Sequence, residues 1–108
     1  MPFVFVKEPV VWWPVKVRVP ADGGATADQV FHARFRILAA PAFDRAFAGG
    51  ANALLRAVTL GWRELLQPDG SDLEFSPATL EMLLELPFIQ VAMADAYAEA
   101  MAGGPRKN

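Results

Sequence analysis

The side chains that could do chemistry in this chain are few, and each lacks the partners that its chemistry needs. His32 is the only histidine and cysteine is absent, which excludes the usual zinc sites, a thiolate nucleophile and disulfide bonds. Ser71 and Ser76 are the only serines. A turn around Asp-Gly explains the first, and a helix cap before Pro77 explains the second. We expect a protein that is not an enzyme, with no catalytic residue, metal site or cofactor.

Two further patterns also favour plain structural interpretations. The carboxylate pairs Glu81–Glu85 and Asp95–Glu99 have helical spacing and face away from the apolar residues, as on a solvated helix face. The segment 69–72 lacks the alternating acidic residues of a calcium loop, so a turn is expected there.

Basic residues alternate with apolar ones in two segments, at Lys16 and Arg18 and again at Arg34 and Arg36. On paired strands, this period of two places all four on one face. Such a face could bind an acidic partner helix or nucleic acid, or it could protect a sheet edge from aggregation. The net charge of −2 makes nucleic acid the least favoured of these.

Trp12 and Trp13 precede Pro14, and neighbouring strand side chains point to opposite faces. One of them is therefore expected to be exposed, as a binding anchor or as a cover over the end of the hairpin. The candidate partner-binding residues are Trp12, Trp13, Lys16, Arg18, Arg34 and Arg36.

The elements that must position these residues are strands in the first third of the chain. Residues 15–19 and 31–37 alternate strictly between apolar and polar types, and the turn formers of 20–27 separate them, which predicts an antiparallel hairpin. Residues 3–6 could add a third strand.

The remaining chain has helical signals. Helices are expected around Pro41 to Phe47, over residues 54–66 with Gly61 as a weak point, from Ser76 onward, and from Pro87 to Met101. We predict an α+β fold, with an N-terminal hairpin or small sheet on a bundle of about four helices. Residues 1–108 form a single domain, with 1–39 mainly strand, 41–102 mainly helix and 103–108 a frayed tail.

Composition sets the remaining limits. The 108 residues include 54% hydrophobic types, enough for a core without disulfides and in excess of what so short a chain hides easily. We therefore expect self-association, partner binding or both. No apolar run is long enough for a signal peptide or a membrane span, so a cytoplasmic protein without membrane or nucleic-acid partners is expected.

Taken in order, several segments resemble the tail assembly chaperones of long-tailed phages and prophages. The resemblance depends on their order and spacing, and it extends from about Val11 to the end of the chain. The segments are Trp13-Pro14-Val15-Lys16-Val17, the Pro-Ala-Asp-Gly-Gly turn, Phe31-His32-Ala33-Arg34-Phe35-Arg36, Val58-Thr59-Leu60-Gly61-Trp62, Pro68-Asp69-Gly70, Phe75-Ser76-Pro77 with Leu80 and Leu83-Leu84, and Lys107-Asn108.

The resemblance implies a small, non-catalytic protein that binds the tape measure protein and recruits tail tube subunits during assembly in the host cytoplasm. Such proteins are absent from the mature virion. Two alternatives remain open: a structural tail protein of the tube or completion class, which would show more strand, and a small regulatory module that binds a ligand.

Overall fold

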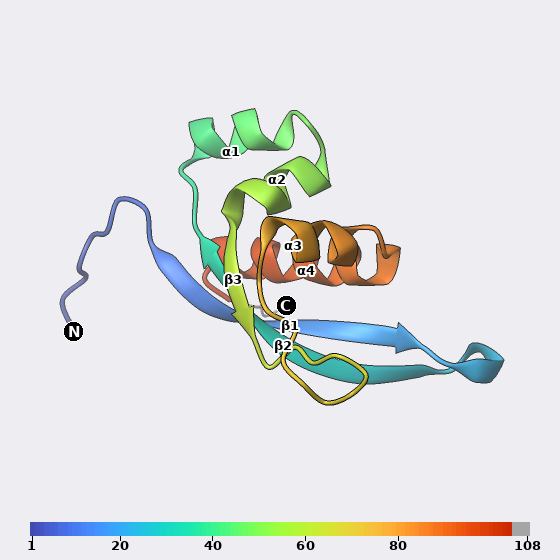
Figure 1. Ribbon diagram of the computed structural model, residues 1–108. Helices are drawn as coiled ribbons and strands as arrows, with labels where there is room; N and C mark the ends of the chain where they lie inside the picture. The colour runs from blue at the N-terminus through green and yellow to red at the C-terminus, as the bar shows by residue number, and fades with distance from the viewer. Residues whose placement is uncertain (105–108) are drawn as a thin grey trace.

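The described part of the chain folds as a three-stranded antiparallel sheet with four helices on one side of it (Figure 1). The computed structural model describes residues 1–104. The elements in chain order are β1 (Val10–Pro20), the short 3-10 turn η1 (Asp22–Gly24), β2 (Thr26–Arg36), α1 (Ala40–Phe47), α2 (Ala51–Val58), β3 (Thr59–Arg63), α3 (Pro77–Leu84) and α4 (Pro87–Met101). The predicted α+β fold is confirmed. Of the predicted tail, residues 105–108 lie outside the described residues.

The hairpin of β1 and β2 is the longest feature of the sheet. Its register places Val15 opposite Phe31, and these two residues lie on the face that is buried under the helices. Gly23 and Gly24 form the turn with φ angles of +76° and +83°, which glycine adopts without the penalty of a side chain. The predicted antiparallel pairing is confirmed.

The third strand is not the one that the sequence suggested. Residues 3–6 form no strand, and the helix predicted over residues 54–66 ends at Val58, where the chain passes directly into β3. β3 pairs antiparallel with β2, and an irregularity between Arg34 and Phe35 accommodates its course. Residues 59–63 form a strand instead of continuing the helix because β2 has backbone groups with which they can pair, and because Gly61 destabilises a helix at this point.

The last two helices, α3 and α4, begin where the sequence signals predicted. Ser76 accepts a hydrogen bond from the N–H of Thr79, whose hydroxyl accepts one from the Ser76 N–H, so α3 begins with a reciprocal capping box. Pro87 separates α3 from α4. Arg56 of α2 forms a two-pronged ion pair with Glu81 of α3 at 2.6 and 2.8 Å, which joins the two helices at the surface.

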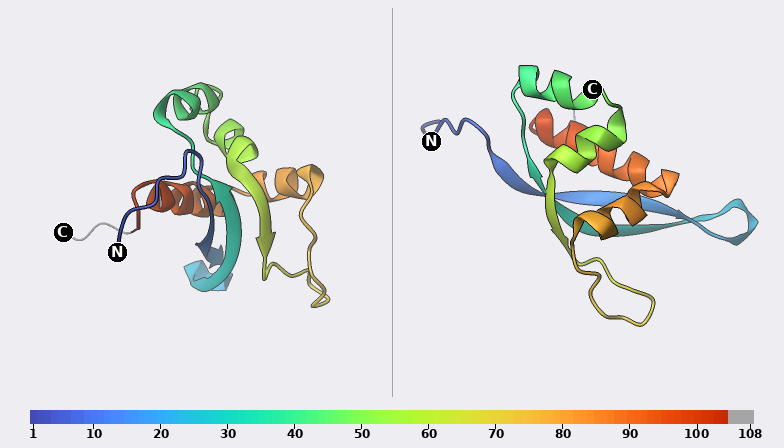
Figure 2. Two further views of the ribbon diagram at one scale, coloured as in Figure 1. Left: turned by 90° about the vertical axis from the view of Figure 1, so that its left-hand side faces the viewer. Right: turned by 45° about the horizontal axis from the view of Figure 1, so that its top comes forward.

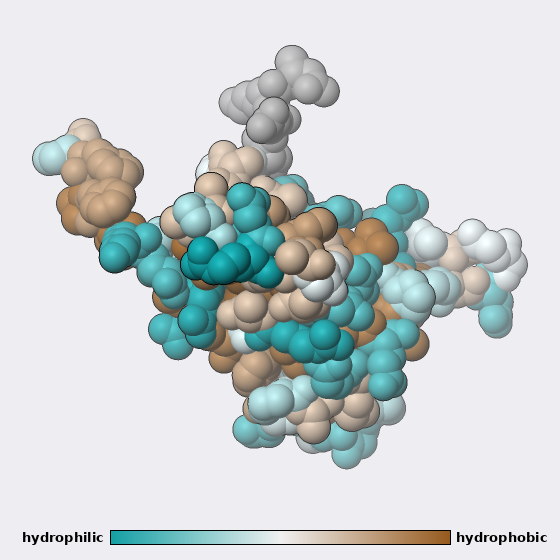
Figure 3. Space-filling view, turned by 90° about the horizontal axis from the view of Figure 1, so that it is seen from above, coloured by the Kyte–Doolittle hydropathy of each residue, from teal (hydrophilic) through white to brown (hydrophobic). Residues whose placement is uncertain are grey.

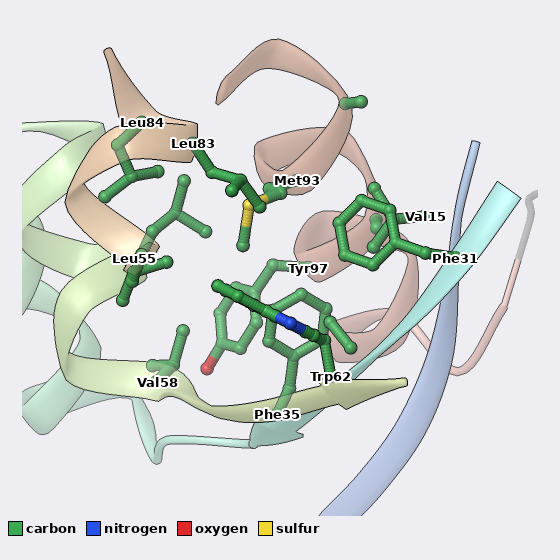
Figure 4. Packing of buried hydrophobic residues seen from close by; sticks show 14 of the residues in the cluster. Val15, Phe31, Phe35, Leu55, Val58, Trp62, Leu83, Leu84, Met93 and Tyr97 are labelled. Carbon is green, nitrogen blue, oxygen red and sulfur yellow. The ribbon is translucent and has the colours of Figure 1, made fainter. Parts of the chain in front are cut away.

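The core lies between the sheet and the helices (Figure 4). Aromatic side chains form its centre, where the rings of Tyr97 and Phe35 lie nearly perpendicular with their centroids 5.3 Å apart. Met93 and Leu55 fill the space toward the helices and are fully buried. The Trp62 indole, from β3, donates to the Leu73 carbonyl at 2.7 Å, so its polar atom is satisfied inside the core.

Candidate partner-binding face of the sheet

The face of the sheet that points away from the core collects the predicted basic residues. Along β1 and β2 the buried positions are odd-numbered, so the even-numbered side chains share the opposite face, which we call the outer face. Figure 2 shows the helices grouped on the other side of the sheet. Five of the six candidate residues lie on the outer face: Trp12, Lys16, Arg18, Arg34 and Arg36.

The two tryptophans divide between the faces, as their adjacency predicts. Trp12 lies on the outer face with 42% of its surface exposed. Trp13 points toward the core and its indole N–H donates to the Glu99 carboxylate of α4 at 3.3 Å. Trp13 is therefore a packing residue. Glu99, which was expected on a solvated helix face, accepts a hydrogen bond from Trp13.

The outer face contains one further basic residue that the sequence patterns did not predict. Arg63 of β3 lies opposite His32, and its guanidinium carbon is 4.7 Å from the centre of the Trp12 ring. This distance is that of a cation–π contact, which joins β3 to the exposed indole of β1. Arg63 was not predicted on this face because residues 54–66 were expected to form a helix, whereas Arg63 belongs to β3.

The charges of the outer face are unequal in number and only partly paired. The carboxylate of Glu8 is 3.6 Å from Arg36, and the carboxylate of Glu64 is 2.8 Å from His32 Nδ1 and 3.5 Å from Arg63. Within the described residues, the remaining cations Lys16, Arg18 and Arg34 form no ion pair. Asp28 lies opposite Arg18 on the same face, so the excess positive charge of the outer face comes from Lys16 and Arg34, although the chain as a whole carries −2.

The middle of the outer face is also sterically open. Gly61 lies across from Arg34, and nothing lies within 4 Å of the position that a Cβ on Gly61 would occupy. Trp12 lies on the other side of Arg34, on β1. An exposed aromatic ring with Arg34 opposite it, and with Lys16 further along the same strand, is suited to hold an acidic partner with an apolar anchor.

The residues considered for other chemistry have structural roles. The Ser71 hydroxyl and N–H both donate to the Asp69 carboxylate, at 2.6 and 2.9 Å, and these bonds lower the pKa of Asp69. Ser76 caps α3, as described above. Among residues 1–104, no three His, Asp or Glu side chains gather closely enough to hold a metal ion.

Comparisons with protein-family models, with curated proteins and with solved structures find no match for this chain. No helix of the described part of the chain is both long and apolar enough to cross a membrane.

Proposed function

We propose that this chain is a non-catalytic tail assembly chaperone of a long-tailed phage or prophage. It binds the tape measure protein through the outer face and recruits tail tube subunits in the host cytoplasm, without entering the mature virion. The observation that carries the proposal is the outer face itself, with Trp12 exposed and Lys16, Arg18 and Arg34 unpaired.

The chemistry of this face suits a long helical partner. Acidic residues on one side of the partner helix form ion pairs with the basic side chains of the outer face, and an apolar residue of the same helix packs on the Trp12 ring. The charges set the register and the association rate, while the ring contributes most of the contact area. The residue sequence from Val11 onward supports the family, because it resembles these chaperones in the order of its segments.

The element content supports a chaperone over a tube or completion subunit. A structural subunit of that class was expected to show more strand, and the chain has 40% helix against 28% strand. In this proposal the sheet binds the partner through its outer face, and the helices pack on the opposite side and stabilise it.

The test is co-expression with the tape measure protein of the same genome, followed by purification through a tag on either partner. Arg34→Glu places a negative charge at the centre of the outer face and is expected to weaken binding about tenfold or more. Arg45→Glu on α1 makes the same change in net charge away from the sheet and is the matched control. Absence of co-purification, or equal losses for both variants, would contradict the proposal.

A further inference from the structure

The first six residues form an arm that stands apart from the folded body. Phe3 and Phe5 are 87% and 76% exposed, and they alternate with Val4 and Val6, which are also exposed. Figure 3 shows the arm as a hydrophobic projection at one end of the molecule. Aromatic and β-branched residues in alternation are typical of a strand, yet the arm pairs with no strand of its own chain. Such a segment is suited to complete a sheet elsewhere.

The sheet has an open edge of matching length. The hydrogen bonds from Ile37 N to the Pro9 carbonyl and from Ala21 N to the Ala25 carbonyl show that the odd-numbered residues of β2 face β1. The even-numbered residues therefore direct their N–H and C=O groups to the other side, where β3 pairs only from His32 onward. At Asp28 and Val30 this edge has no strand beside it among the described residues. Figure 1 shows the hairpin continuing past the end of β3.

An apolar groove lies beside this open edge. Its volume is about 530 Å³, and Val30 and Phe31 form its wall on β2. Leu66, from the segment after β3, and Phe88, at the start of α4, lie among its other lining residues. Unpaired backbone groups beside pockets for alternate side chains are the two requirements for recognition of an added strand.

The wall of the groove also carries the one strained backbone position. Glu64 is the only residue other than glycine with a left-handed φ, +64°, among residues 1–104. Backbone strain of this kind concentrates where a fold holds a ligand or partner.

The arm is too short to reach the edge of its own β2. Val10 pairs with Arg36, and Val30 lies six residues further along β2, roughly 20 Å at about 3.3 Å per residue. The link from Val6 to Val10 spans at most about 14 Å when fully extended. The sheet order β1-β2-β3 adds the width of two strands to this path. A folded-back arm therefore cannot place residues 3–6 along Asp28 and Val30 of the same chain.

We infer that the arm of one copy adds as a strand to the open β2 edge of a second copy, with Phe3 and Phe5 seated in its groove. The arm and the groove are different surfaces of the molecule, so a contact that is not reciprocal is head-to-tail and leaves one free arm and one free groove in each dimer. Copies then continue into chains or close into a ring. This inference does not depend on the proposed function.

The first experiment is sedimentation velocity of the full chain over a micromolar concentration series. Wild type is expected to form species larger than dimers. Phe3→Ser/Phe5→Ser removes the anchors, and Val30→Lys/Leu66→Lys places lysines at the edge and in the groove, as natural sheet edges do. Each double variant is expected to raise the dissociation constant about tenfold or more. Met82→Lys/Val91→Lys is the matched control, because these residues on α3 and α4 are equally exposed but lie outside the groove.

The decisive measurement is a mixture of the two variants. The arm variant retains an intact groove and the groove variant retains an intact arm, so the mixture is expected to form a dimer and nothing larger. A wild-type chain that stays monomeric, variants that assemble like wild type, or a mixture without a dimer would each overturn the inference. Circular dichroism of each variant checks that the fold is retained.

A cross-link locates the contact directly. The chain has no cysteine, so Phe5→Cys in one copy and Leu66→Cys in another introduce the only thiols. Oxidation of the mixture is expected to join the two different chains. Equal yield with Met82→Cys in place of Leu66→Cys would contradict the assigned position of the arm.

Discussion

Tyr97 fixes the last helix to the end of the hairpin through its hydroxyl. The hydroxyl accepts a hydrogen bond from the Leu38 N–H at 3.1 Å and donates one to the Arg36 carbonyl at 3.0 Å. Tyr97→Phe leaves both backbone groups without this partner, so the free energy of unfolding is expected to fall by about 1–3 kcal/mol. Urea denaturation at neutral pH measures this loss. Unchanged stability would mean that water replaces the hydroxyl at no cost.

The same residue gives the fold a dependence on alkaline pH. Burial raises the pKa of the Tyr97 phenol above its usual value of about 10, although the hydrogen bond from Leu38 N–H opposes the rise. The contribution of the protonated phenol is therefore fully present below about pH 10 and is lost as the pH rises through the folded-state pKa. Tyr97→Phe is expected to remove this part of the alkaline destabilisation, and denaturation at a series of pH values compares the two proteins.

The neighbouring tryptophans are expected to differ in what their removal costs. Trp13→Ala removes a partly buried ring and its bond to Glu99, and is expected to cost about 2 kcal/mol or more of unfolding free energy. Trp12→Ala is expected to cost less than about 1 kcal/mol but to weaken binding of the tape measure protein. Chemical denaturation and the co-purification assay separate the two effects. A larger stability loss for Trp12→Ala would contradict the assignment of the faces.

At the scale of elements, α3 depends on its capping box. Ser76→Ala removes the acceptor of the Thr79 N–H bond and is expected to lower the free energy of unfolding by about 1 kcal/mol. Ser76→Thr retains a hydroxyl at the same position and serves as the control. Equal losses for the two variants would contradict a role for the cap.

The elements that were predicted correctly are those with local signals. The period of two in residues 15–19 and 31–37 defined the hairpin, and Ser76-Pro77 and Pro87 marked two helix starts. β3 was missed because its apolar residues also fit a helical spacing with Leu54 and Val58, and its strand state depends on pairing with distant β2. Local pattern alone cannot reveal a partner strand that is about thirty residues away in the sequence.

At the scale of the whole molecule, the fold gathers positive charges on one face, although the net charge of the chain is negative. The net charge of −2 conceals an outer face with three unpaired cations, and the sequence predicted this face because strand alternation is visible in both hairpin strands. Arg63 and the open β2 edge were not predicted, since both follow from the position of β3. The groove likewise needs residues from five separate segments to come together.

The most direct test of the proposed function is an NMR titration of the full chain, labelled with ¹⁵N, with the tape measure protein of the same genome. The account predicts that signals of the outer face change together, including the Trp12 indole and the amides near Arg34, while the buried Trp62 indole keeps its position. Signal changes confined to the helices would contradict the claim that the outer face is the binding surface. So would unchanged signals at concentrations of the tape measure protein at which the two proteins co-purify.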